Sequence, residues 1–152
     1  MPTMINKQIT FLTFLILSVT FSFSQSSSVE EIIELRIQSN ENNAVVVVGD
    51  KELFAQIEIP TFYTNRSYEP AWTENKNIKD LMESLESSYD EGLDPEDYHY
   101  KRINELLDKK KSGSLSNSEK ADLDLLLTDA LILYASHLLE GKLEQSALRK
   151  KW

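Results

Sequence analysis

The chain has 152 residues, of which 41% are hydrophobic and 27% charged, a composition typical of one globular domain rather than of a disordered or fibrous chain. Its formal net charge of −9 argues against binding to nucleic acid or to an anionic membrane surface, because both need clustered Lys and Arg. The chain contains no cysteine, which excludes a disulfide framework, a thiolate nucleophile and zinc held by thiolates.

Residues 1–24 have the pattern of a secretory signal peptide. Lys7 precedes a largely apolar run over 9–19, and small residues lead up to a cleavage point near Ser24 and Gln25. An uncleaved anchor is the alternative, but this run is shorter than the roughly 20 residues that span a bilayer. We therefore expect an exported protein whose mature part has no membrane attachment.

The mature part, residues 25–152, is predicted to be one mainly α, compact helical domain with a small β element near 44–48. An amphipathic helix is expected over 29–38. The β-branched run at 44–48 is the one strong strand signal. The segment 51–59 either pairs back as a hairpin through Gly49-Asp50 or leads into a helix, and Pro60 favours a short helix over 60–66.

Three longer helices follow. The first is predicted over 77–91, with Asn77 as its cap and Gly92 as its left-handed end. The second runs over 95–110, with Asp94 as cap and Pro95 at its first position. The third and longest runs over 116–140 from a capping box to Gly141, and a short last helix is expected over 145–150. Residues expected to face the core are Ile78, Leu81, Met82, Leu85, Tyr89, Tyr98, Ile103, Leu106, Leu107, Leu123, Leu126, Leu127, Ala130, Leu131, Tyr134, His137 and Leu138, with Leu125, Leu133 and Leu139 widening the face of the longest helix and Trp72 anchoring an irregular aromatic segment.

The chemistry-bearing residues form no site with the spacing of a known catalytic or metal motif. Residues 86–97 hold six acids, but their spacing fails the EF-hand pattern, and a helix end followed by a helix start explains them better. His99 and His137 lack metal-ligand spacing and are interpreted as structural. A carboxylate pair for glycoside hydrolysis has no specific signal among 25 acids. The aromatic residues either line a sugar-binding surface or belong to the core, and the core is favoured: Tyr63, Tyr68, Trp72, Tyr98 and Tyr100.

Three ordered motifs resemble one known family. The stretch from Phe62 to Trp72 resembles the F-Y-x-x-R-x-Y-x-P-x-W segment of large periplasmic L,D-transpeptidases of the YkuD type, and 92–99 is similar to their G-L-x-P-x-D-Y-H element. Residues 127–142 are similar to their L-T-x-A…Y…H-L…G-[RK] helix end. The positions that carry the resemblance are Tyr63, Arg66, Tyr68, Pro70, Trp72, Gly92, Leu93, Pro95, Tyr98, His99, Tyr134, His137 and Gly141.

The resemblance is to the N-terminal scaffold domain of that family and implies a largely helical fold that supports catalytic and peptidoglycan-binding modules. The H…S-x-G-C signature of the catalytic domain is absent, so no catalytic, cofactor or metal residue is carried over. The resemblance implies a periplasmic location and a non-catalytic role in peptidoglycan cross-linking and cell-wall organisation. It also implies that those modules, in the same or a downstream chain, are the partners. The DNA after the codon for Trp152 is accordingly expected to encode them. A free-standing envelope module that binds peptidoglycan or a protein partner is the alternative, and a hydrolase using two carboxylates is a weaker third.

Overall fold

The computed structural model describes residues 27–38 and 45–141, and in these the protein is mainly α with one small hairpin. This confirms the predicted fold class. The predicted signal peptide, the last helix over 145–150 and Trp152 lie outside the described residues. The helices are α1 (Val29–Gln38), α2 (Glu58–Asn65), α3 (Asn75–Glu86), α4 (Tyr100–Lys111) and α5 (Asn117–Glu140), with two 3-10 helices, η1 (Ser87–Glu91) and η2 (Pro95–Tyr98), and strands β1 (Val47–Val48) and β2 (Lys51–Glu52).

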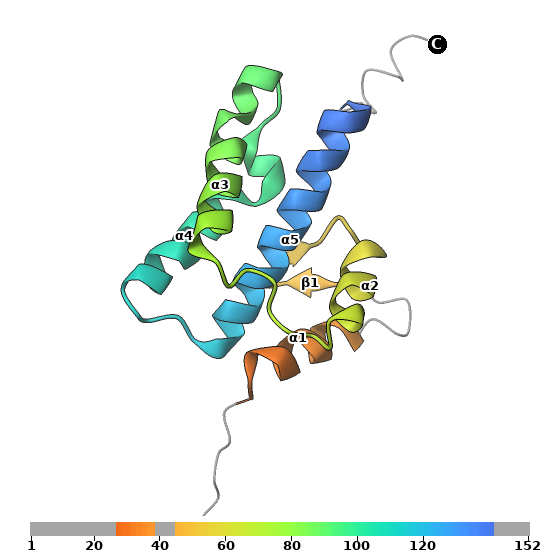
Figure 1. Cartoon of the computed structure of the whole chain (residues 1–152), viewed down its shortest axis with the longest axis vertical. Helices are drawn as coiled ribbons and strands as arrows, with labels where there is room; N and C mark the ends of the chain where they lie inside the picture. The colour runs from red at the N-terminus through yellow and green to blue at the C-terminus, as the bar shows by residue number, and fades with distance from the viewer. Residues whose placement is uncertain (1–26, 39–44, 142–152) are drawn as a thin grey trace, which may run out of the picture.

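Helix α5 is the central element, and the other helices lie on its two sides (Figure 1). It begins with the predicted capping box, in which Ser116 and Glu119 each accept a hydrogen bond from the other's backbone N–H. A hydrogen bond from Lys109, together with those from Ser116, lowers the pKa of Glu119 from its ordinary 4.5 to about 2. The cap therefore fixes the start of α5 and also connects it to the end of α4.

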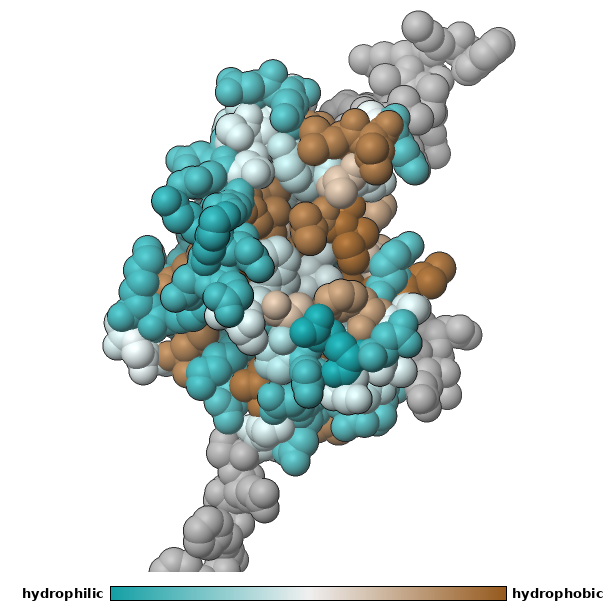
Figure 2. Space-filling model, viewed as in Figure 1, coloured by the Kyte–Doolittle hydropathy of each residue, from teal (hydrophilic) through white to brown (hydrophobic). Residues whose placement is uncertain are grey.

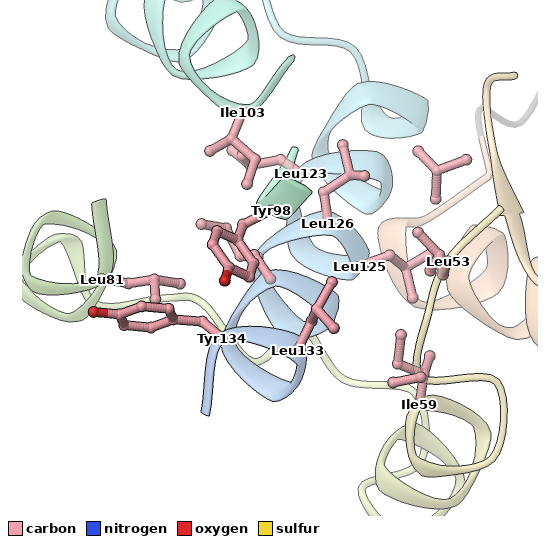
Figure 3. Packing of buried hydrophobic residues seen from close by; sticks show 14 of the residues in the cluster. Leu53, Ile59, Leu81, Tyr98, Ile103, Leu123, Leu125, Leu126, Leu133 and Tyr134 are labelled. Carbon is pink, nitrogen blue, oxygen red and sulfur yellow. The ribbon is translucent and has the colours of Figure 1, made fainter. Parts of the chain in front are cut away.

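The core consists of two groups of side chains that meet at α5. On one side Leu125 packs near Leu53 and Ile59, which come from the hairpin exit and from α2 (Figure 3). On the other side Tyr98 and Ile103 bring η2 and α4 against the same helix (Figure 3). Because α5 is covered on both sides along its first half, every residue from Ala121 to Ala130 is buried, including the polar ones.

The hairpin alternative for the segment after Gly49-Asp50 is correct. Val47 pairs with Glu52 and Val48 with Lys51 in antiparallel register, and Gly49 takes the positive φ of 64° that the tight turn requires. The strand is shorter than the predicted 44–48. Beyond Val47 the Leu53 N–H still donates to the Val46 carbonyl, but the Val46 N–H donates to the Gln56 side chain at 2.7 Å, so the ladder ends there.

Several predicted helix limits are wrong, each for a local reason. Helix α2 begins two residues before Pro60, so Pro60 lies inside its first turn, where a missing N–H costs nothing. Helix α3 begins at Asn75, which places Asn77 inside it, with Glu74 as the residue before its start. It ends at Glu86, and the predicted continuation to 91 is the 3-10 helix η1, closed by Gly92 with φ 77°.

The predicted helix over 95–110 is interrupted at His99. Asp94 caps and Pro95 begins η2, as expected, with the Asp94 carboxylate accepting the N–H of Glu96. His99 then has φ 59°, and its carbonyl accepts the N–H of Ile103, so it marks the start of α4. Sequence periodicity did not reveal this break, because the apolar spacing continues across it.

The second half of α5 is less buried than predicted. Leu131 is 44% exposed, Leu138 49% and Leu139 86%, although Leu133 and Tyr134 are buried. Tyr89, also expected in the core, is 67% exposed. Figure 2 shows hydrophobic residues gathered at the surface over this part of α5. The helix runs past the layer that α1, α2 and the hairpin provide, so no described element covers these leucines (Figure 1).

This difference in burial predicts a large loss of stability for one leucine-to-alanine substitution in α5 and a small loss for another. Leu125→Ala removes a fully buried side chain and is expected to lower the free energy of unfolding by about 3 kcal/mol. Leu131→Ala, which we would have expected to be equally costly from the sequence, should cost less than about 1 kcal/mol. Urea denaturation followed by circular dichroism measures both. Equal losses in the two variants would contradict the exposure of Leu131.

Candidate functional site

A polar network centred on Asp124 of α5 joins the first motif to the long helix. Asp124, 4% exposed, accepts the backbone N–H groups of Ala71 at 2.8 Å and Trp72 at 3.0 Å, and the Tyr63 hydroxyl at 2.6 Å. The Thr128 hydroxyl lies 2.8 Å from the Tyr63 hydroxyl and 2.9 Å from the Trp72 indole nitrogen, which donates to it. Burial, with the adjacent Asp124 carboxylate, raises the pKa of Tyr63 far above its usual range, so its phenol stays neutral.

The turn that delivers Ala71 and Trp72 to this network is held by Arg66. Its Nε donates to the Glu69 carbonyl at 2.7 Å and its Nη2 to the Pro70 carbonyl at 3.1 Å. Ser67 and Tyr68 have φ values of 55° and 61°, and such left-handed geometry costs a non-glycine residue about 1 kcal/mol. The Arg66 side chain therefore stabilises this unfavourable backbone turn from within, and the Asp124 carboxylate attaches the turn to α5.

A second buried carboxylate, Asp129, connects three elements. It is 0% exposed; one oxygen accepts the Ala55 N–H at 2.8 Å and the other lies 2.7 Å from His99 Nε2. With the carboxylate ionised, the bond requires the proton to be on that nitrogen. The left-handed backbone of His99 thus brings its ring onto α5, and Asp129 holds η2 and the hairpin exit to the same helix.

The remaining motif residues lie at the other end of α5. The Tyr98 hydroxyl is 2.9 Å from His137 Nδ1, and the Tyr134 hydroxyl donates to Glu91 at 2.8 Å. Burial raises the pKa of both tyrosines to about 12. The Leu93 N–H donates to the Ser88 carbonyl at 3.0 Å, which closes the Gly92 turn, and the Leu93 side chain is buried.

The structure thus gathers the motif residues around α5 as structural contacts. Tyr63 and Tyr98 are fully buried, and Tyr68, Trp72 and Tyr100 pack partly buried against the core, so the aromatic set does not form one open surface. Pro95 is buried in η2 and Gly141 ends α5 with φ 76°.

Residues 27–38 and 45–141 contain neither a metal-binding cluster nor a membrane-spanning helix. No group of three or more Asp, Glu and His side chains there is placed to hold a metal ion. No helix in those residues is both long and apolar enough to cross a membrane. The histidines are bonded to Asp129 and Tyr98, and both oxygens of Asp124 and of Asp129 accept internal hydrogen bonds, so these groups fix geometry rather than face a substrate.

Neither the site at Asp124 nor the role of Asp129 was predicted from the sequence. The sequence nevertheless contained a signal for each of these residues. Asp124 lies between Leu123 and Leu125, and Asp129 lies two residues after Leu127, in a helix expected to be buried. A charged residue inside such a leucine-rich stretch is rarely buried without a partner. Asp122 follows the same rule, since it pairs with Arg36 of α1.

One comparison with known proteins gives a match. The model of a family described as a scaffold domain matches residues 58–152, which is more than half of the chain. The matched region begins at α2 and contains all the motif positions described above. Searches of curated proteins and of solved structures found no significant match.

Proposed function

Because this chain belongs to the scaffold-domain family, we propose that it is the non-catalytic scaffold portion of an exported L,D-transpeptidase-like protein that serves peptidoglycan cross-linking. The observation that carries this proposal is the family match over 58–152, joined to the residues that carry the transpeptidase resemblance. Those residues make internal bonds around α5, which is what a scaffold requires of them. Catalysis then belongs to modules outside this domain, since the chain has no cysteine to act as the transpeptidase nucleophile.

The exposed half of α5 is the surface that we assign to the partner modules. Leu131, Leu138 and Leu139 are all exposed, and Leu138 lies seven residues after Leu131, so these two face the same side of the helix. Exposed apolar residues on one face favour association with another protein surface, because burial removes their contact with water. The occupant we propose is the catalytic and peptidoglycan-binding part of the transpeptidase, which a scaffold must hold in place.

The test is binding between this protein and separately produced catalytic and peptidoglycan-binding modules of an exported L,D-transpeptidase from the same source. Calorimetry is expected to show an association that Leu131→Glu with Leu138→Glu weakens at least tenfold. Leu35→Glu is the control and is compared with Leu131→Glu alone, so that both variants add one charge; Leu35 is 62% exposed on α1, away from this surface. This control should leave the affinity unchanged.

A second experiment distinguishes the scaffold role from that of a free-standing peptidoglycan-binding module. The protein is incubated with purified peptidoglycan sacculi in the absence of the modules. Failure to bind the modules, with strong binding to sacculi alone, would show a free-standing peptidoglycan-binding module instead of a scaffold. Equal weakening by the Leu35 and the α5 variants would overturn the assignment of the surface.

A further inference from the structure

A pocket of about 530 Å³ opens where the segment after Pro70 meets the end of α4 and the start of α5. Its apolar wall includes Trp72, Leu115 and Leu123, and the first two are partly buried against the core. The indole of Trp72 is fixed by its hydrogen bond to Thr128, so its ring offers a preorganised wall rather than a mobile one. The pocket therefore suits an apolar group of modest size.

Two lysines line the same pocket without a carboxylate partner. Lys110 Nζ donates to the neutral Asn75 side-chain oxygen at 3.0 Å, and Lys120 Nζ to that of Asn117 at 3.2 Å. In the described part of the chain neither forms an ion pair. Their neighbours differ, because Lys109 pairs with Glu119 and Lys111 with Asp108. Lys51 and Lys101 also form no ion pair in the described residues, but the pocket that they line contains four acids, Asp50, Glu96, Glu105 and Asp122, whereas Asp124 is the one acid that lines the pocket at Trp72.

The local charges favour an anion at this pocket. Asp124 is the acidic residue that contributes to the lining, but it is 4% exposed and its oxygens accept bonds from Ala71, Trp72 and Tyr63. Lys120 lies one turn after the start of α5, where the helix dipole is positive. An incoming carboxylate would thus meet two ammonium groups, while the nearby acid faces the interior network.

We propose that this pocket binds an organic carboxylate that carries an apolar group next to its acid. The apolar group packs on Trp72 and Leu123, and the carboxylate takes the place of the missing acidic partner of Lys110 and Lys120. Charge-assisted hydrogen bonds of this kind are about twice as strong as neutral ones. The site goes beyond the scaffold role and does not depend on it.

The probe is 4-phenylbutyrate, compared with 4-phenylbutanamide, which has the same shape and no charge. Titrations of the whole protein, followed by ¹⁵N–¹H NMR shifts of the Trp72 and Thr73 amides, are expected to show at least tenfold tighter binding of the acid. The double variant Lys110→Met with Lys120→Met should lose this preference. Lys51→Met with Lys101→Met is the matched control, because it removes two exposed lysines outside the pocket and changes the net charge equally. Circular dichroism before each titration establishes that the variants are folded.

A second pair of probes separates a small-molecule acid from the end of a peptide. Acetyl-Ala-Phe is used with a free C-terminal carboxylate and with a C-terminal amide. Tighter binding of the free peptide than of phenylbutyrate would identify a peptide C-terminus as the ligand class, and the reverse order a small organic acid. Equal affinity for acid and amide in both pairs, or an acid preference that survives the loss of Lys110 and Lys120 in a folded variant, would overturn the proposal.

Discussion

Asp124→Ala is expected to lower the free energy of unfolding by about 3–5 kcal/mol. The substitution removes the acceptor of two backbone N–H groups and of the Tyr63 hydroxyl, and an unsatisfied buried donor costs about 1–3 kcal/mol. Without this acceptor, the strained turn held by Arg66 also loses its attachment to α5. Urea denaturation measured by both circular dichroism and tryptophan fluorescence gives the loss.

Two control variants distinguish the network from a simple loss of charge. Asp124→Asn keeps one carbonyl oxygen as an acceptor, and we expect about half the loss of the alanine variant. Asp108→Ala removes an acid whose side chain is 75% exposed and should cost less than about 0.5 kcal/mol. A loss below 1 kcal/mol for Asp124→Ala would mean that water replaces the carboxylate, and Asp124 would then not organise the first motif.

Asp129→Ala is expected to be as damaging, at about 3–5 kcal/mol, because it removes a fully buried carboxylate that binds His99 and leaves the Ala55 N–H without its acceptor. The expected damage is local as well as global. Amide hydrogen exchange should become faster at Ala55, and the His99 ring should lose its single conformation, since nothing else fixes its Nε2 in the described structure.

The result for Asp129 is checked against two further variants. Asp129→Asn keeps the same shape and should retain the protection of Ala55 better than alanine does. His99→Ala removes only one of the two bonds of Asp129 and should leave the exchange at Ala55 slower than in Asp129→Ala. If all three variants exchanged alike, the link between η2 and the hairpin exit would not pass through this carboxylate.

The sequence alone determined the features that depend on neighbouring residues. Local capping chemistry and apolar spacing predict four such features: the extent of α1, the capping box at Ser116, the end of α5 at Gly141 and the Asp94-Pro95 start of η2. The mainly α class follows for the same reason. Local energies at these positions agree with the tertiary structure, so no long-range contact overrides them.

The tertiary structure decided what lies between distant segments. The break at His99 exists because Asp129, 30 residues later, binds its ring, and the turn after α2 is held by Asp124, more than 50 residues away. The exposure of Leu131 and Leu138 could not be predicted from the sequence either. Periodicity identifies the apolar face of a helix but not how far the other elements extend along that face. Burial is a property of the packed layers, and only their placement around α5 shows which leucines are covered and which acids are held among them.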